Sequence, residues 1–253
     1  MSGHSKWATI KHKKGALDAK RGKVFSKLSK ELMVAAKQGG SDPTMNPTLR
    51  TAIQKAKSVN MPSDNITRAV KKGAGELEGS TFEEFNFEGY ASGGVALVVA
   101  ILTDNRNRTT AEIRHMFTRH GSSFAAQGAV TRSFVRKGLI LVDGKAVEED
   151  KLMSIVLDAG AEDMTNTGDA YEVLTDPAAF VAVTEALEKA GIKTISAEVS
   201  LIPLAPVPVN DKHLASSILK FVSDLEEHDD VQNVYTNMDM SDEVMKEMEA
   251  EAG

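Results

Sequence analysis

The chain contains no cysteine, so it has no disulfide, thiol nucleophile, cysteine-ligated zinc or iron–sulfur cluster. It also lacks a long apolar run. The longest, residues 95–102, has the length of a strand, whereas a membrane-spanning helix needs about 18 apolar residues. Residues 1–6 are not followed by the apolar stretch of a secretory signal. From these absences we expect a soluble cytoplasmic protein that enters no membrane.

Recognisable catalytic motifs are absent as well. The chain has no GxSxG, SxxK or HRD string. Carboxylate pairs such as Glu83 with Glu84 and Asp229 with Asp230 are adjacent in sequence, and neighbouring residues of a strand point to opposite faces. We therefore predict no catalytic residue. The alternative is an enzyme whose active site is assembled from residues far apart in the sequence.

Cofactor and metal motifs are missing too. Residues 92–94 contain two glycines, but they lack the Lys and Ser or Thr of a phosphate loop and precede a strand-like run, which favours a hairpin turn. The histidines show neither an HExxH pattern nor metal-ligand spacing; they are His4, His12, His115, His120, His213 and His228. We expect neither a metal ion nor a cofactor.

What the sequence does contain is a strong asymmetry of charge. The chain of 253 residues has a formal charge of -6. Residues 1–72 hold sixteen Lys and Arg against four acids, a net charge of +12, and the remainder holds fourteen against thirty-two, a net charge of -18. Ten of the cations precede Gln38 and face only Asp18 and Glu31, so pairing between helical turns cannot neutralise them. A basic arm on an acidic body indicates a polyanionic partner for the arm.

Three helices are predicted in the basic region. Apolar residues recur at helical spacing over residues 18–38, a second helix covers residues 47–60 with Pro47 at its first position, and a third covers residues 62–73. Their apolar stripes are small. We therefore expect a helical module that is marginally stable alone and docks on the rest of the chain.

Strand-like and helical patterns alternate beyond this module. A hairpin is expected from residues 82–90 and 95–103, and a helix follows in which Thr109 and Glu112 form a capping box. Further strands are predicted at residues 130–135, 139–142, 171–174 and 194–202, with helices at 148–159 and 177–190.

The last part of the chain follows Pro203, Pro206 and Pro208, which predict a stiff linker. A helix at residues 211–227 and a strand at 231–236 cannot form a core alone, so we expect them to complete the unit that begins near residue 82.

The predicted fold class is therefore α+β or α/β, with an N-terminal three-helix module and two small α/β sandwich domains, one inserted in the other. The predicted limits are 1–76 for the basic helical domain, 77–135 plus 205–238 for one α/β domain, 136–204 for the inserted α/β domain, and 239–253 for an acidic tail, expected to be a frayed helix.

The basic arm supplies the candidate binding residues. Lysines, with nearby histidine, arginine and tryptophan, would contact a nucleic acid; the candidates are Lys6, Trp7, Lys11, His12, Lys13, Lys14, Lys20, Arg21, Lys23 and Lys27. Trp7 has two interpretations, an anchor that pins the arm to the body or a platform that stacks on an unpaired base. Arg106 and Arg108 lie in a polar run after a strand, where they would bridge domains or, alternatively, contact a polyanion.

Several runs of residues resemble the YebC/PmpR family over nearly the whole chain. They are GHSKW at 3–7, KHKK at 11–14, DAKRGK at 18–23, FEGY at 87–90, DNRNRT at 104–109, AGAED at 159–163 and DDVQNVY at 229–235. The resemblance implies a three-domain α/β protein, a probable transcriptional regulator that binds DNA. It also implies kinship with the mitochondrial translational activator of cytochrome c oxidase and with bacterial relatives that act on the ribosome, especially at proline-rich stretches. One departure is Ala91-Ser92, where family members commonly carry Gly-Pro.

Two hypotheses of function follow. The first is a DNA-binding regulator, although the arm offers chiefly Lys, and Arg21 and Gln38 are its best candidates for contacts with base edges. The second is a translation factor that contacts ribosomal RNA, for which shape and phosphate contacts suffice. A third class, a scaffold that binds only proteins, would leave nucleic-acid affinity independent of the arm's lysines. The oligomeric state and any ligand between the domains are not predicted.

Overall fold

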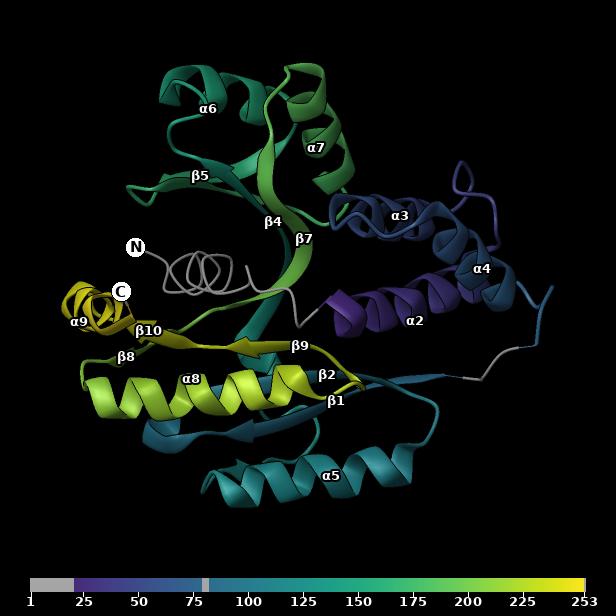
Figure 1. The fold of residues 1–253 in the computed structure, drawn as a ribbon. Coiled ribbons are helices and arrows are strands. Elements are labelled where there is room, and N and C mark those ends of the chain that lie inside the picture. Colours follow the sequence, from purple (N-terminus) through teal and green to yellow (C-terminus); the bar gives the residue numbers. More distant parts are fainter. Residues whose placement is uncertain (1–20, 79–81, 253) are drawn as a thin grey trace.

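The computed structural model describes residues 21–78 and 82–252 (Figure 1). It has an N-terminal module of helices and two four-stranded sheets, each with helices packed on one face. This confirms the predicted α+β fold. Among the helices that the structure describes, none is both long and apolar enough to span a membrane.

The N-terminal module consists of α2 (Arg21–Gly39), α3 (Pro47–Ser58) and α4 (Ser63–Gly73). These helices match the three that the apolar spacing predicts, and residues 18–20 of the first prediction lie outside the described residues. A Cβ at Gly73 would collide with the backbone of Met33, so glycine is what lets the end of α4 lie directly against α2. The module has a small apolar core of its own, formed by Leu28, Leu32, Ala35, Ala36, Leu49, Ala52, Ala56, Met61, Ile66 and Ala69.

The first sheet has the strand order β3-β1-β2-β9. Its strands are β1 (Glu83–Tyr90), β2 (Ala96–Thr103), β3 (Ser123–Phe124) and β9 (Val231–Thr236). β1 and β2 form the expected antiparallel hairpin, and Gly93 and Gly94 take φ values of 73° and 74° in its turn. β9 occupies the residues predicted for it and pairs antiparallel with β2.

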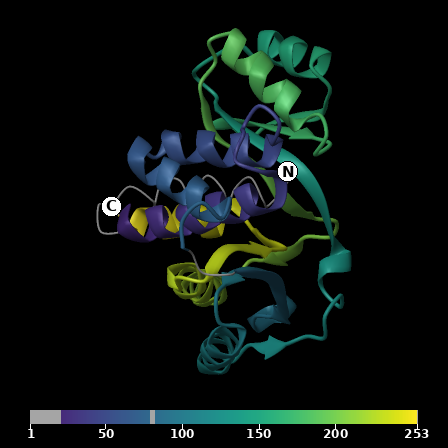
Figure 2. The same cartoon turned by 90° about the vertical axis from the view of Figure 1, so that its right-hand side faces the viewer.

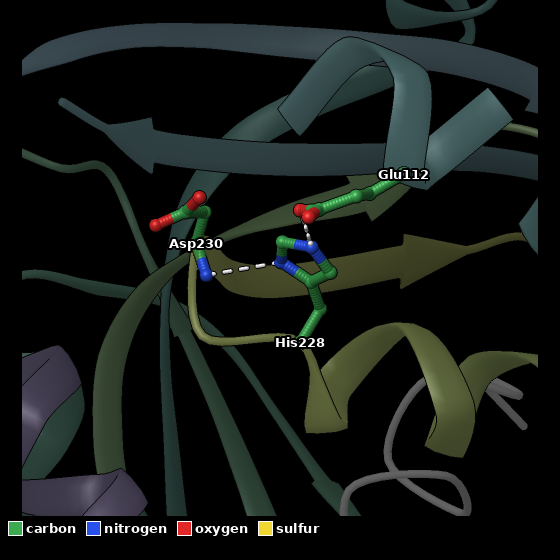
Figure 3. A group of neighbouring side chains, drawn as sticks. All are labelled: Glu112, His228 and Asp230. Carbon is green, nitrogen blue, oxygen red and sulfur yellow. Dashed lines mark hydrogen bonds and ion pairs between the residues drawn. The ribbon is translucent and has the colours of Figure 1, made fainter. Parts of the chain in front are cut away.

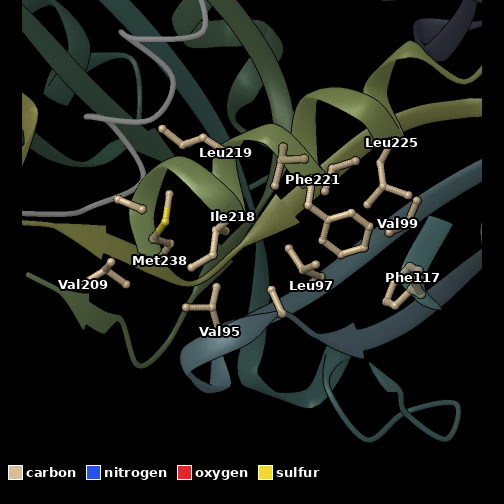
Figure 4. Packing of buried hydrophobic residues seen from close by; sticks show 14 of the residues in the cluster. Val95, Leu97, Val99, Phe117, Val209, Ile218, Leu219, Phe221, Leu225 and Met238 are labelled. Atoms are coloured by element: carbon tan, nitrogen blue, oxygen red, sulfur yellow. The ribbon is translucent and has the colours of Figure 1, made fainter. Parts of the chain in front are cut away.

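Two helices cover one face of this sheet, α5 (Arg106–Arg119) and α8 (Lys212–Glu227). Their apolar side chains meet alternate residues of β2 in the largest core of the molecule, which includes Leu97, Val99, Phe117, Ile218 and Phe221 (Figure 4).

The prediction that Thr109 caps α5 is wrong. The helix begins three residues earlier, at Arg106, and Asn105 is the N-cap, because its side chain accepts a hydrogen bond from the Arg108 amide at 3.1 Å. Thr109 is instead buried in the first turn.

The second sheet has the order β5-β6-β4-β7, and each neighbouring pair is antiparallel. Along the chain the elements alternate as strand–helix–strand–strand–helix–strand, which is a ferredoxin-like arrangement. They are β4 (Phe134–Asp143), α6 (Glu149–Asp158), β5 (Ala161–Asn166), β6 (Ala170–Thr175), α7 (Phe180–Lys189) and β7 (Thr194–Pro203).

One prediction in this region is wrong, and one strand is not predicted. The strands expected at residues 130–135 and 139–142 are a single strand, β4, because Arg136, Lys137 and Gly138 stay extended and pair with β7. β5 is a strand that the sequence does not predict, since its Ala161–Asn166 sequence is polar and largely exposed on a sheet edge.

The proline segment is also more than a linker. Residues 207–209 form a short strand, β8 (Val207–Val209), which pairs in parallel with β10 (Met238–Met240). Val209, Met238 and Met240 are buried in the core of the first sheet unit. The tail continues as α9 (Asp242–Ala252), and Val244 is buried in that same core, so the prediction of a frayed tail is wrong for the start of this helix.

β4 and β7 extend from the second sheet to the first. Phe134 and Leu201 on these strands pack with Ala96, Val98 and Tyr235 on the face of the first sheet that α5 and α8 leave free. Figure 2 shows the helices of the N-terminal module at the level between the two sheets. The domain limits proposed from the sequence stay predictions, because they concern units that fold independently rather than strand order.

A buried carboxylate holds the connection between the sheets. Glu88, only 4% exposed, accepts backbone hydrogen bonds from Gly128, Val130 and Thr131 at 2.6, 2.6 and 2.9 Å. Burial alone would raise the pKa of the Glu88 carboxyl, but these donors favour the charged form and hold the pKa below its usual value. The side chain thereby fixes the loop that leads into β4.

Candidate functional site

Three lysines on one face of α2 reach the C-terminal end of α8. Lys23 donates to the carbonyl of Glu227 at 3.0 Å, and Lys27 to the carbonyl of Glu226 at 2.6 Å. Lys30 donates to the carbonyl of Asp229 at 3.0 Å. Their spacing of four and three residues places them along a single stripe of the helix. We call Lys23, Lys27 and Lys30 the α2 lysine row.

The C-terminal end of α8 needs this positive charge. The last carbonyls of a helix lack intrahelical partners and carry partial negative charge, which a basic residue in the last turn normally offsets. α8 has no basic residue in its last turn and ends instead in Glu226 and Glu227. The α2 lysine row supplies the missing cations from another part of the chain.

Asp230 is the centre of the site. It lies in the turn between α8 and β9 and is 2% exposed. One carboxylate oxygen accepts from Lys30 at 2.6 Å; the other accepts from Arg108 at 2.7 Å and from the Thr109 hydroxyl at 2.8 Å. Thr103 lies at 3.1 Å from the second oxygen. One carboxylate thus joins α2, α5 and the end of β2.

These partners keep the carboxyl group of Asp230 ionised. Burial would raise the pKa of its carboxyl, but hydrogen bonds from Lys30, Arg108 and Thr109, together with the charge of Lys30, outweigh burial. They hold the pKa well below its usual value, so the group is ionised at neutral pH.

A histidine completes the cluster (Figure 3). The backbone amide of Asp230 donates to Nδ1 of His228 at 3.1 Å, so this nitrogen is the acceptor and Nε2 carries the proton. Nε2 then donates to Oε2 of Glu112 at 2.9 Å. The ring links the end of α8 to α5.

Glu112, His228 and Asp230 also offer three ligand atoms within 4.8 Å of one another. A metal ion would have to displace the proton on Nε2 of His228 and compete with Lys30 and Arg108 for Asp230. We therefore interpret the group as a hydrogen-bonded cluster, not a metal centre.

A cavity of about 500 Å³ opens beside the cluster, and its wall carries both signs of charge. Its lining residues are Lys23, Lys30, Asp104, Arg108, Glu112, Glu227, His228, Asp229 and Asp230. Several of these groups already neutralise one another, so the arrangement suits a joint between elements better than a ligand pocket.

Arg106 and Arg108, the two arginine candidates from the sequence, make different contacts. Arg108 contacts Asp230, which Lys30 of the N-terminal module also contacts, so Arg108 takes part in a contact between module and body through a shared carboxylate. Arg106 lies over the ring of Phe85 at 4.2 Å and 3.6 Å from a carboxylate oxygen of Glu83, with its side chain 59% exposed.

The predicted nucleic-acid residues are only partly within the described range. Lys6, Trp7, Lys11, His12, Lys13, Lys14 and Lys20 lie outside the described residues. Arg21 is the first residue of α2. Lys23 and Lys27 lie against α8, a contact that their sequence positions do not suggest, and their binding to a nucleic acid stays a prediction.

Asp230, His228 and Glu112 are not predicted as a group from the sequence. The available signal is the run at 229–235 that carries the family resemblance, but the sequence pattern predicts that adjacent carboxylates such as Asp229 and Asp230 point apart on a strand. Asp230 precedes β9, and its main partners lie 200 and 122 positions away in the chain.

Comparison with known proteins identifies the family. A family described as the TACO1/YebC protein N-terminal domain matches residues 5–76, and one described as the TACO1/YebC second and third domain matches residues 82–238. The chain belongs to the TACO1/YebC family. This confirms the resemblance seen in the sequence.

Relatives of the TACO1/YebC chain cover it almost completely. A protein of Geobacter sulfurreducens is 55% identical over 98% of this chain and 100% of its own length, and one of Citrifermentans bemidjiense is 54% identical with the same coverage. Both are named probable transcriptional regulatory protein. The crystal structure of a conserved hypothetical protein from Aquifex aeolicus has a TM-score of 0.85 and 48% identity, covering 94% of this chain and 98% of that one.

Proposed function

We propose that this protein is a non-enzymatic regulator of gene expression that binds DNA through its Lys-rich N-terminal domain in the cytoplasm. The observation that carries the proposal is the separation of charge, +12 over residues 1–72 against -18 over the rest. Because the acidic body repels a nucleic acid and the basic region attracts it, the charge pattern orients the protein on a polyanion. The names of the relatives support a regulatory role.

The absence of enzymatic activity is part of the proposal. The most densely charged cluster of the described residues, around Asp230, consists of groups that satisfy one another through hydrogen bonds. The carboxylate of Asp230 is therefore fully engaged and is not free to accept a substrate proton.

A second candidate is a factor that binds ribosomal RNA. The specific observation in its favour is that the basic region contains thirteen Lys against three Arg. Lysine binds phosphate as a point charge, whereas sequence-specific contacts with base edges usually come from Arg, Asn or Gln. A Lys-rich surface therefore suits recognition of phosphate and shape, as in structured RNA.

The two candidates are separated by comparing gel shifts on the protein's own promoter DNA with sedimentation on ribosomes. Sequence-selective shifts at moderate salt support the DNA-binding regulator. Sedimentation with ribosomes, without such shifts, supports the RNA-binding factor instead. The variant K11Q/K13Q/K14Q tests the role of the arm, and unchanged affinities in this variant would favour a scaffold that binds only proteins.

A further inference from the structure

We propose that the outer faces of α3 and α4 contact the phosphodiester backbone of a nucleic acid, and that the α2 lysine row does not. The inference rests on the proposed function and deepens it by locating the contact surface. Its basis is the position of the cations in the N-terminal module.

All three lysines of the α2 lysine row already have hydrogen-bond partners within the protein. Lys23 and Lys27 donate to carbonyls at the end of α8. Lys30 donates to the Asp229 carbonyl in the turn that follows and also pairs with the buried Asp230 at 2.6 Å. A phosphate that took these lysines would have to displace the contacts between the module and the body. The row therefore acts as an internal joint.

The hairpin of α3 and α4 is different. Residues 47–73 contain six Lys and Arg and a single acid, Asp64. Lys55 pairs with Glu31 of α2. The other five form no ion pair with any residue that the structure describes; they are Arg50, Lys57, Arg68, Lys71 and Lys72. Glu76 and Glu78 follow only after the helix has ended at Gly73.

The packing of α3 and α4 leaves these cations on the surface of the module. The buried residues of α3 and α4 are small or aliphatic, such as Ala52, Ala56, Ile66 and Ala69. The opposite faces carry Lys57, Arg68, Lys71 and Lys72, all of which are exposed.

The cations extend onto the end of α2. The end of α4 lies against Met33, and the exposed Lys37 follows Met33 by about one helical turn. Lys37, Lys71 and Lys72 therefore gather at one end of the module. We call Lys37, Lys57, Arg68, Lys71 and Lys72 the α3–α4 surface.

The chemistry of this surface fits a phosphate backbone. Cations that form no ion pair within the protein gain most from a chain of phosphates, because each neutralised phosphate releases condensed counterions. Helix C-termini also favour lysine through their partial charge, but Arg68 lies in the middle of α4, outside the reach of that effect.

The test compares three full-length variants with the wild type. K57Q/R68Q/K71Q/K72Q removes four cations of the α3–α4 surface, and K145Q/K151Q/K189Q/K193Q removes four exposed lysines of the second sheet unit as a matched control. K57R/K71R/K72R retains the charge of the surface while changing its side chains. Fluorescence anisotropy measures binding to a labelled duplex DNA and to ribosomal RNA over a series of salt concentrations.

We expect the first variant to bind about eightfold more weakly at 0.1 M salt for each phosphate that it no longer neutralises, with a salt slope on duplex DNA that is lower by about 0.9 per phosphate. The control and the charge-preserving variant should match the wild type on the same nucleic acid. If the first variant binds like the wild type, the proposed position of the contact surface is wrong, and the proposed function is unaffected. If the wild type binds neither nucleic acid, the proposed function falls and this inference with it. If the wild type binds anionic lipid vesicles but neither nucleic acid, both proposals are likewise overturned.

Discussion

Asp230 shows how one residue can hold three elements in place. Its carboxylate is buried and bears hydrogen bonds from Lys30, Arg108 and Thr109. In the variant Asp230→Asn, both cations lose their counter-charge while the shape of the side chain is retained. We expect the free energy of unfolding to fall by about 3 kcal/mol, the lower end for a buried pair, because the Arg108 side chain is 46% exposed. Urea unfolding measures the change, and Asp229→Asn, an exposed neighbour, should change it little.

The pH dependence of this difference provides a second check. The pKa of Asp230 is lower in the folded protein than in the unfolded chain, so its stabilisation is complete above the unfolded value of about 3.9. That stabilisation is lost as the pH falls toward the folded value. The gap in stability between wild type and Asp230→Asn should therefore be constant near neutral pH and shrink below about pH 4. A gap that grew on acidification would contradict the assigned role.

Glu88 gives an independent prediction at the same scale. Glutamine in its place keeps one carbonyl oxygen but turns an amide group toward backbone donors of Gly128, Val130 or Thr131. At least one of these N–H groups then loses its charged acceptor, and we expect a loss of about 2 kcal/mol in thermal or urea unfolding. Glu84→Gln, on the exposed end of β1, is the matched control and should be neutral. Equal losses in the two variants would show that the loop does not depend on Glu88.

The residues of the candidate site illustrate what sequence patterns can and cannot predict. The spacing of Lys23, Lys27 and Lys30 indicates a single stripe on a helix, and their excess of charge is visible without a structure. Their partners are not visible, because the carbonyls at the end of α8 lie about 200 residues away and belong to the backbone. An unpaired charge in the sequence therefore leaves open whether its counterpart is external or internal.

At the scale of the element, helix α3 depends on its N-cap residue, Asn46. Asn46 is buried; its side-chain oxygen accepts from the Leu49 amide at 3.0 Å, and its nitrogen donates to the carbonyls of Ala35 and Gly40. We expect Asn46→Ala to cost about 2 kcal/mol, because it removes the cap of α3 and the bonds that tie α3 to the end of α2. Asp211→Ala removes an exposed cap with one such bond to Leu214 and should cost about 1 kcal/mol or less. Circular dichroism during thermal unfolding compares the two.

Elements with one strong pattern can be predicted well, and elements defined by their partners cannot. The helices of the N-terminal module and β9 follow from apolar spacing and lie close to the expected residues. β5 and β8 are strands only because β6 and β10 lie beside them. The polar sequence of β5 and the prolines around β8 carry no strand signal that outweighs their local preference. Tertiary pairing decides both.

At the scale of the whole molecule, the positive charge of the N-terminal region divides into cations with internal partners and cations that stay exposed. From the sequence, the excess positive charge of the basic arm is expected to face an external polyanion. The structure divides that charge among its described residues: the α2 lysine row contacts the acidic body, and the α3–α4 surface stays exposed. The division predicts that the two sets of cations affect different properties of the protein.

The final prediction concerns the joint between the module and the body. In the variant K23Q/K27Q/K30Q, the carbonyls at the end of α8 and the carboxylate of Asp230 lose the positive charges that α2 supplies. The core of the module does not include these lysines, so we expect the module to stay helical but to dock less tightly. Small-angle X-ray scattering should then give a larger radius of gyration than for the wild type, whereas K57Q/R68Q/K71Q/K72Q should leave the radius unchanged. Salt screens the exposed contact of Lys23 but screens the buried pair of Lys30 and Asp230 much less, so raised salt should expand the wild type less than the substitutions do. Identical scattering from wild type and the α2 variant at low salt would show that apolar contacts alone hold the module in place.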